Sequence, residues 1–467
     1  MLCTISVWRA NALCTLGSLK TMQHDIPLET TGPNADAMAE AVSTCIRCGF
    51  CLSACPTYDV LQRESHSPRG RIILMKEVLE GSMPADKAAP HLDACLGCLA
   101  CEPACPSGVS YRHLLSPYRS LVRDRIPVAW PQRLQRWLAA QTLPYPKRFR
   151  FAARMGQIGK SFSALVPSFL RPMLDLLPET LPAATKLQRR YSPVGDQVGR
   201  VALLAGCAQR VLAPEINEAT IAVLRHIGLE VLVPPEQSCC GSLAWHVGDG
   251  DRAAKFARKN VRVFSSDSQP IDAVVTNAAG CGSGMQEYGM ILRGTDIESQ
   301  AASLAATVKD VSVVVCEHAE RLRLKRPALV HEGESIVRVA YHDACHLANA
   351  QGVRLQPREL LCRVPDVELV DVAEAHLCCG SAGTYNLDQP ETADELGRRK
   401  AKAVLATGAP IVISGNIGCL TQLQTHLNSM ATEAHPAPRV MHTMEFLSAC
   451  LEESTFFETN PGPKRST

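Results

Sequence analysis

The stretch that decides the fold of the N-terminal part is Cys45-Ile-Arg-Cys48-Gly-Phe-Cys51-Leu-Ser-Ala-Cys55-Pro56, a C-x2-C-x2-C-x3-C-P pattern. The pattern returns 50 residues later as Cys95-Leu-Gly-Cys98-Leu-Ala-Cys101-Glu-Pro-Ala-Cys105-Pro106. This spacing is typical of proteins that bind two [4Fe-4S] clusters, because three closely spaced thiolates hold one cluster and the fourth is carried to the neighbouring one. A four-thiolate zinc site is the alternative, but its cysteine pairs are normally separated by a longer loop.

The two copies predict a pair of clusters that exchange their fourth ligands. One cluster is expected to have the ligands Cys45, Cys48, Cys51 and Cys105, and the other the ligands Cys95, Cys98, Cys101 and Cys55. Residues 68–80, between the copies, have an apolar stripe at helical spacing, so we expect a mainly α-helical two-cluster ferredoxin module. Arg69 and Arg71 in this predicted helix are interpreted as solvated side chains.

A second set of cysteines forms a tandem repeat over residues 199–450. The first copy has Cys207, then Cys239-Cys240-Gly241, then Cys281; the second has Cys345, then Cys378-Cys379-Gly380, then Cys419. The four cysteines of one copy are separated from those of the other by 138, 139, 139 and 138 residues. Such a constant offset indicates an internal duplication.

Apolar runs and helical patterns alternate in both copies and predict strand–helix–strand–helix–strand order. That order favours parallel sheets with the cysteines at the carboxyl ends of the strands, where α/β folds bind their ligands. Four thiolates suit one iron–sulfur cluster per repeat, with buried free thiols or a zinc ion as alternatives. His246, His342 and His346 lie next to the cysteine motifs, as candidates for tuning or ligating a cluster or as ordinary polar residues.

Composition limits the class of protein. Among 467 residues, 46% are hydrophobic and 20% charged, and the formal net charge is +2, so extensive disorder and a basic nucleic-acid surface are excluded. The 21 cysteines occur without a signal-peptide pattern or an apolar run long enough to span a bilayer, which predicts a cytoplasmic protein. A Pro-rich, cationic and aromatic connector over 126–198 adds peripheral contact with the cytoplasmic face of the inner membrane as a further expectation.

The combination of the two patterns resembles the iron–sulfur subunits of bacterial glycolate oxidase (glycolate dehydrogenase). The resemblance covers about residues 40–450 and is closest at Cys55-Pro-Thr-Tyr58, Gly206-Cys-Ala-Gln209, Glu287-Tyr-Gly289 and His376-Leu-Cys-Cys-Gly-Ser-Ala-Gly-Thr-Tyr385. It implies an electron-transfer subunit of a complex that oxidises glycolate to glyoxylate. FAD is expected on partner subunits and not on this chain, and electrons are expected to pass to a quinone or another acceptor. Relatives of the same layout imply the alternatives of lactate or glycerol-3-phosphate oxidation and of heterodisulfide reduction, and a zinc-stapled scaffold is the alternative from a different class.

One departure from the family pattern concerns the cysteine repeats. Fuller versions of the Cys-Cys-Gly (CCG) motif end in C-x2-C, whereas the last positions here are Gly284 and Gln422. This departure argues against a five-thiolate cluster and leaves open a four-thiolate cluster in each repeat or no cluster in one of them. The expected domains are a poorly ordered N-terminal extension (1–35), the two-cluster ferredoxin module (36–125), the helical connector (126–198), the first CCG α/β repeat (199–335), the second CCG α/β repeat (336–455) and a tail (456–467).

Overall fold

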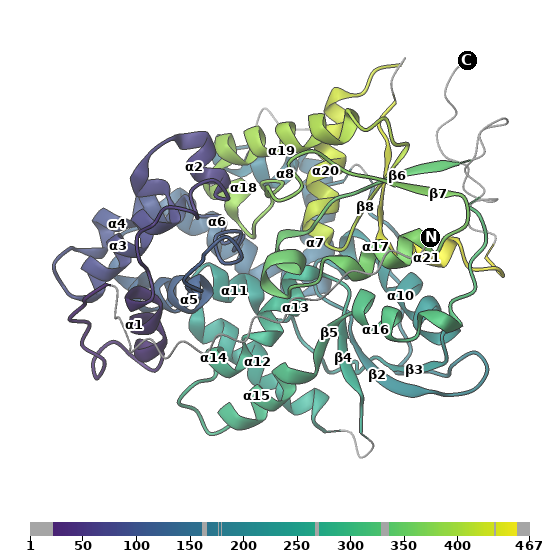
Figure 1. The fold of residues 1–467 in the computed structure, drawn as a ribbon, viewed down its shortest axis with the longest axis horizontal. Coiled ribbons are helices and arrows are strands. Elements are labelled where there is room, and N and C mark those ends of the chain that lie inside the picture. Colours follow the sequence, from purple (N-terminus) through teal and green to yellow (C-terminus); the bar gives the residue numbers. More distant parts are fainter. Residues whose placement is uncertain are drawn as a thin grey trace, which may run out of the picture.

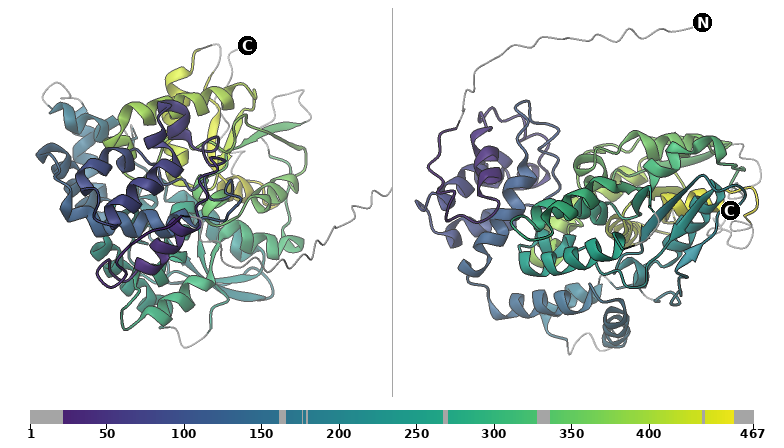
Figure 2. Two further views of the ribbon diagram at one scale, coloured as in Figure 1. Left: turned by 60° about the vertical axis from the view of Figure 1, so that its left-hand side comes forward. Right: turned by 90° about the horizontal axis from the view of Figure 1, so that it is seen from below.

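A computed structural model describes residues 22–160, 166–175, 177–178, 180–266, 270–327, 336–433 and 436–454. A helical module at one end of the molecule packs against a body with two parallel sheets (Figures 1 and 2). Within the described residues, no helix combines the length and the apolar character needed to cross a bilayer. The structure thus has the expected coarse architecture, a helical cysteine-rich module followed by a duplicated α/β unit, while the expected domain boundaries stay predictions.

The helices of the N-terminal module surround the two cysteine motifs. Its helices are α1 (Ala35–Ser43), α2 (Pro56–Leu61), α3 (Pro68–Leu79), α4 (Ala85–Asp93) and α5 (Tyr111–Val122). Pro56 and Pro68 each open a helix, a position where the missing N–H is tolerated. The Ser67 side chain accepts a hydrogen bond of 3.0 Å from the Gly70 amide and caps α3. Since a Cβ at Gly70 would lie 2.1 Å from the Glu64 carbonyl oxygen, only glycine fits this close approach.

Part of the segment expected to be poorly ordered belongs to this module. Residues 1–21 lie outside the described residues, but Met22 and Ile26 are buried in the same apolar cluster as Met38, Val42 and Leu114. The structure therefore extends the module's core toward the N-terminus beyond residue 36. The connector forms helices α6 (Trp130–Thr142), α7 (Pro146–Lys160) and α8 (Arg171–Asp175).

Each repeat contains a four-stranded parallel sheet, and the first carries an additional antiparallel edge strand. The first sheet has the order β1-β3-β2-β4-β5 and the second β7-β6-β8-β9. The strands are β1 (Arg190–Tyr191), β2 (Gly199–Leu204), β3 (Leu229–Leu232), β4 (Ala273–Thr276), β5 (Val308–Asp310), β6 (Val337–Tyr341), β7 (Val367–Val370), β8 (Ile411–Ser414) and β9 (Arg439–His442). The sequence patterns predicted three strands per repeat, so β1, β5 and β9 are additions that only the structure reveals.

The helices of the repeats cover the sheets on both faces (Figure 1). Those of the first repeat are α9 (Gln209–Leu212), α10 (Glu215–His226), α11 (Ser242–His246), α12 (Gly250–Phe264), α13 (Ala279–Gln286), α14 (Tyr288–Ile291), α15 (Glu298–Thr307) and α16 (Val311–Glu317). Those of the second are the π-helical turn η6 (His346–Ala350), α17 (Leu355–Cys362), α18 (Tyr385–Asp388), α19 (Pro390–Leu405), α20 (Ile417–Met430) and α21 (Thr443–Ala449).

The two repeats exchange their last helices. Helix α16, which ends the first repeat, packs on α17 of the second, and α21, which ends the second, packs on α10 of the first. A single apolar cluster consequently contains side chains of both sheets, among them Val201, Val275, Val339 and Ile413. The repeats therefore share one core, which fixes their cysteine-bearing loops relative to each other.

Candidate metal centres

The first ferredoxin motif and one cysteine of the second surround a small solvent-open cavity. Its lining includes Cys45, Cys48 and Cys51 from the loop between α1 and α2, together with Cys105 from the second motif. These are the four residues predicted as one ligand set. Cys101 also borders the cavity, so the two sites are immediate neighbours.

The second ferredoxin site has the complementary composition. Cys95, Cys98 and Cys101 line a second small cavity with Cys55, the last cysteine of the first motif. The structure thus places each fourth cysteine beside the other motif, as the spacing predicted. The soft sulfur donors in groups of four fit a [4Fe-4S] cluster at each site.

The two motifs share an unusual backbone conformation as well as a sequence pattern. Arg47 and Gly97, which precede the middle cysteine of each motif, have φ values of +59° and +65°. Gly49 and Leu99, which follow it, have φ values of +88° and +59°. Left-handed residues on both sides of the middle cysteine curl the chain around the cavity, and Arg47 and Leu99 adopt this conformation without the freedom of glycine.

The charge environment differs between the two sites. Burial raises the pKa of the Cys51 thiol to about 11, so metal binding must displace a proton there. At Cys95 burial also opposes ionisation, but the guanidinium groups of Arg71 and Arg119 outweigh it and lower the pKa of the thiol. Cys95 is therefore the thiol of the second site that ionises most readily, whereas burial raises the pKa of the neighbouring Cys101 thiol well above its usual range.

Arg71 is a buried partner of the second site, and its interpretation as a solvated side chain was wrong. The residue is 1% exposed, and its guanidinium donates to the His91 carbonyl oxygen at 2.8 Å, to Thr57 Oγ1 at 2.9 Å and to Cys55 Sγ at 3.8 Å. Arg69, by contrast, is partly exposed and forms an ion pair with Glu64. Nothing in the local sequence separates the two arginines, because the difference depends on which face of α3 meets the loop of the first motif.

In the first repeat, the four predicted cysteines converge at the carboxyl ends of β2, β3 and β4. The Sγ atoms of Cys207 and Cys239 are 3.5 Å apart, and those of Cys240 and Cys281 are 3.3 Å apart. Asn260 of α12 donates to the Cys239 carbonyl oxygen at 2.9 Å.

Tyr288 forms a second hydrogen bond to the backbone of the same pair of cysteines. Its hydroxyl donates to the Cys240 carbonyl oxygen at 2.8 Å and accepts a hydrogen bond from the Asn260 amide at 2.9 Å. Sequence analysis did not assign a role to either residue. Tyr288 belongs to a motif that resembles the family, and its burial explains why that motif accompanies the cysteines.

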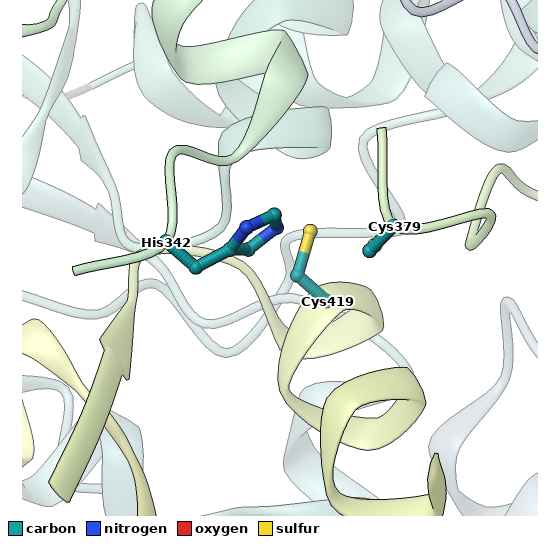
Figure 3. A group of neighbouring side chains, drawn as sticks. All are labelled: His342, Cys379 and Cys419. Carbon is teal, nitrogen blue, oxygen red and sulfur yellow. The ribbon is translucent and has the colours of Figure 1, made fainter. Parts of the chain in front are cut away.

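The second repeat brings together its own four cysteines and one histidine. The sulfur atoms form a chain of contacts that runs from Cys345 through Cys378 and Cys379 to Cys419. His342 joins them from the end of β6, and one ring nitrogen of His342 and the Sγ atoms of Cys379 and Cys419 all lie within 4.8 Å of one another. Figure 3 shows the imidazole beside the Cys419 thiol, with Cys379 opposite.

The second ferredoxin site adjoins the second repeat through buried contacts. Leu96 and Cys98 belong to one apolar cluster with Cys345, Cys378 and Tyr385. Burial and then the nearby Cys345 raise the pKa of the Cys98 thiol well above its usual range. Buried apolar side chains therefore connect these two sets of cysteines directly.

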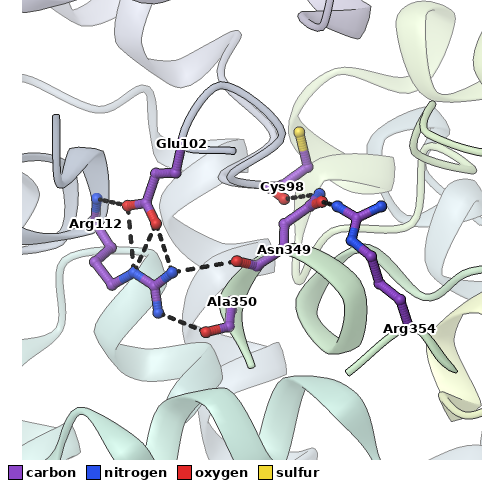
Figure 4. Close-up of polar contacts among 6 residues, drawn as sticks. All are labelled: Cys98, Glu102, Arg112, Asn349, Ala350 and Arg354. Carbon is purple, nitrogen blue, oxygen red and sulfur yellow. Dashed lines mark hydrogen bonds and ion pairs between the residues drawn. The ribbon is translucent and has the colours of Figure 1, made fainter. Parts of the chain in front are cut away.

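Polar contacts fix the same interface (Figure 4). Asn349 of η6 donates its side-chain amide to the Cys98 carbonyl oxygen at 3.0 Å. Arg112 of α5 is paired with Glu102 inside the ferredoxin module and donates to the Ala350 carbonyl oxygen at 2.8 Å. The turn that follows Cys345 is thus attached to the loop that carries Cys98.

A larger cavity of about 690 Å³ lies between the ferredoxin module, helix α6 and both repeats. Cys95 and Cys239, one from each kind of site, line it together with apolar groups such as Leu96, Phe256 and Trp137. His246 and His346 also line it, with ring centroids 5.1 Å apart, and among the described residues neither Nε2 has a hydrogen-bond partner. The size is that of a small-molecule site.

Two kinds of cysteine site on this fold define an iron–sulfur protein with a dicluster ferredoxin module and a tandem cysteine-rich unit. The family model described as a 4Fe-4S dicluster domain matches residues 41–109, and the one described as a cysteine-rich domain matches residues 201–286 and 339–424. These matches confirm the expected multidomain organisation and support iron–sulfur clusters as its cofactors.

Comparison with curated proteins then gives the particular family. The Escherichia coli "Glycolate oxidase iron-sulfur subunit" is 34% identical over 90% of this chain and 96% of its own length. The Bacillus subtilis "Probable glycolate oxidase iron-sulfur subunit" is 35% identical over 81% of this chain and 88% of its own length. A "Lactate utilization protein A" from Exiguobacterium is 26% identical over 54% of this chain and 99% of its own length. The chain belongs to the family of glycolate oxidase iron–sulfur subunits, as the sequence motifs indicated.

Proposed function

We propose that this chain is the electron-transfer subunit of a complex that oxidises glycolate to glyoxylate, with FAD on partner subunits. Family membership supports the proposal, and so does the continuous series of cysteine sites. We place the complex in the cytoplasm, with peripheral contact at the inner membrane through the connector. The proposed ligands are Cys45, Cys48, Cys51, Cys105, then Cys95, Cys98, Cys101, Cys55, and in the CCG repeats Cys207, Cys239, Cys240, Cys281, Cys345, Cys378, Cys379 and Cys419.

The observation that carries this proposal is the apolar contact between the second ferredoxin site and the second repeat. Iron–sulfur clusters supply one-electron transfer, which a two-electron oxidation on a flavin requires when the electrons leave singly. The chain's own residues hold the sites close together: Cys101 borders both ferredoxin cavities, and Leu96 and Cys98 pack with Cys345 and Cys378. A merely structural metal site would need neither a shared border nor a buried link.

Anaerobic purification with iron, zinc and sulfide analysis tests the proposal. We expect a brown protein with at least about eight irons per chain, which its partner flavoprotein reduces on addition of glycolate. A colourless, zinc-containing protein would contradict the proposal in favour of a scaffold. Reduction by lactate or glycerol 3-phosphate with the matching flavoprotein, and none by glycolate, would support the alternative substrates.

We further propose that the terminal acceptor, a quinone or a molecule of similar size, binds in the cavity that Cys95 and Cys239 line. Its apolar walls suit a ring system, while the unpartnered nitrogens of His246 and His346 suit a polar substituent. The heterodisulfide-reductase-like alternative makes the CCG repeat itself act on a disulfide or quinone, and it predicts activity with such acceptors in the absence of any flavoprotein.

A bulky side chain in this cavity is expected to weaken binding of the acceptor without slowing electron transfer from the flavoprotein. Val247 lines the cavity and is 40% exposed, so a Val247→Trp variant adds bulk without opening the core. We expect the KM for a soluble quinone to rise by about tenfold, the effect of losing roughly 1.4 kcal/mol of binding. Reduction of the variant by the flavoprotein should keep its wild-type rate. An unchanged KM would contradict this location.

A further inference from the structure

The two repeats differ in chemistry at one position next to their cysteines. His342 follows β6, and its counterpart at the end of β2 is Leu204, since the paired strands give Val201 and Val339 equivalent positions. His342 is 1% exposed, and among the described residues its ring nitrogens have no oxygen or nitrogen partner, while the group that interacts with the imidazole is the Cys379 thiol. A buried imidazole without a partner is costly unless another group satisfies it.

The position of a partner for His342 follows from the neighbouring thiols. One ring nitrogen of His342 and the Sγ atoms of Cys379 and Cys419 lie within 4.8 Å of one another, a separation that allows all three to ligate one metal centre. His342 directly follows β6, Cys379 lies in the loop after β7, and Cys419 lies in the first turn of α20 after β8, on the side of the sheet where parallel strands end (Figure 3). Imidazole and thiolate ligate the same metals in mixed zinc and iron–sulfur sites.

The final position of the fuller CCG motif offers no competing ligand in either repeat. In the second repeat, the Gln422 amide donates to the Ala393 carbonyl oxygen, and its side-chain oxygen accepts from Asn386. In the first, a Cβ at Gly284 would lie 2.4 Å from the Ser242 Cβ, so no side chain fits there. Within the described part of the chain, the last position of the motif therefore supplies no fifth donor in either repeat, and His342 supplies one in the second.

We propose that His342 is a nitrogen ligand of the metal centre in the second repeat, beside the thiolates of Cys345, Cys378, Cys379 and Cys419. The first repeat then has an all-thiolate site and the second a mixed one. This inference rests on the proposed function in so far as that centre is an iron–sulfur cluster.

A second difference between the repeats is also expected to raise the reduction potential of the second site. The buried Lys400 of α19 occupies the position of Asn260 of α12, because Ala393 and Ala253 make the same contact with Gly380 and Gly241. The second site therefore lies near an ammonium group where the first lies near a neutral amide. Histidine ligation and nearby positive charge both favour the reduced state, so we expect the higher potential in the second repeat.

Metal analysis of matched variants tests the assignment. His342→Leu installs the residue that the first repeat already has, and Cys379→Ser defines the metal content without the second site. We expect His342→Leu to lose metal from the second site to a chelator about 10- to 100-fold faster than the wild type, and His342→Cys to restore retention. His318→Leu, at the histidine that follows α16, is the control and should keep the wild-type rate.

Nitrogen ligation itself is visible by pulsed electron paramagnetic resonance. Protein labelled with 15N-histidine should show a strongly coupled nitrogen that disappears in His342→Leu and persists in His318→Leu. Wild-type metal retention in His342→Leu would overturn the proposal. So would a wild-type metal content equal to that of Cys379→Ser. With about eight irons still present, either result would leave the proposed electron-transfer function intact, whereas a protein without iron would remove that function.

Discussion

Replacing Cys48 by serine is expected to remove the metal centre of the first ferredoxin site and to lower turnover of the complex with an artificial quinone by at least about 100-fold. Mutation of a group that only orients a metal ligand typically lowers metal affinity or activity by about 10- to 100-fold, and loss of a ligand should lower them further. Cys48 is exposed, so its serine variant is expected to fold. The iron content should fall by about four per chain.

The exchanged fourth ligands make this prediction sharper. Cys105→Ser should have the spectrum and iron loss of Cys48→Ser, although it lies in the other motif, because its thiol borders the first cavity. Cys55→Ser should instead match Cys98→Ser, its neighbour at the second cavity. Cys362→Ser is the matched control, since Cys362 is exposed and outside every site. Undiminished turnover and an unchanged iron count in Cys48→Ser would remove the proposed function.

Replacing Arg71 by methionine is expected to destabilise the ferredoxin module by about 2–6 kcal/mol, because two buried acceptors lose their donor and each unsatisfied group costs about 1–3 kcal/mol. The change leaves the His91 carbonyl oxygen and the Thr57 hydroxyl without their donor and removes the positive charge beside Cys55 and Cys95. We therefore also expect the second ferredoxin site to lose its metal earlier during unfolding in denaturant, followed by visible absorbance and circular dichroism.

Arg69→Met is the matched control for this experiment. Its ion pair with Glu64 is partly exposed, so the change should lower the free energy of unfolding by less than about 1 kcal/mol. Equal effects of the two substitutions would contradict the special role assigned to Arg71. A stable Arg71→Met variant with an unchanged second site would do the same.

The sequence was most informative where function depends on local spacing. Three thiols within seven residues, from Cys45 to Cys51, can ligate one cluster through the conformation of a single loop, so their role follows from the pattern itself. The duplicated CCG motif likewise predicted parallel strands, since buried apolar runs ending in a shared motif place those motifs at one edge of a sheet. Strands β5 (Val-Lys-Asp) and β9 (Arg-Val-Met-His) were not predicted because neither is an apolar run like β4 (Ala-Val-Val-Thr) or β8 (Ile-Val-Ile-Ser).

The local sequence determined which side chains can bind metal. The ligand types, their spacing and the duplication are all properties of short segments. Tertiary structure alone decided which neighbours those side chains have. It separated Arg71 from Arg69, joined His342 to cysteines 37 and 77 residues further along the chain, and placed Cys98 against Cys345. These contacts depend on how helices and sheets pack, and packing is set by the whole core and not by any one motif.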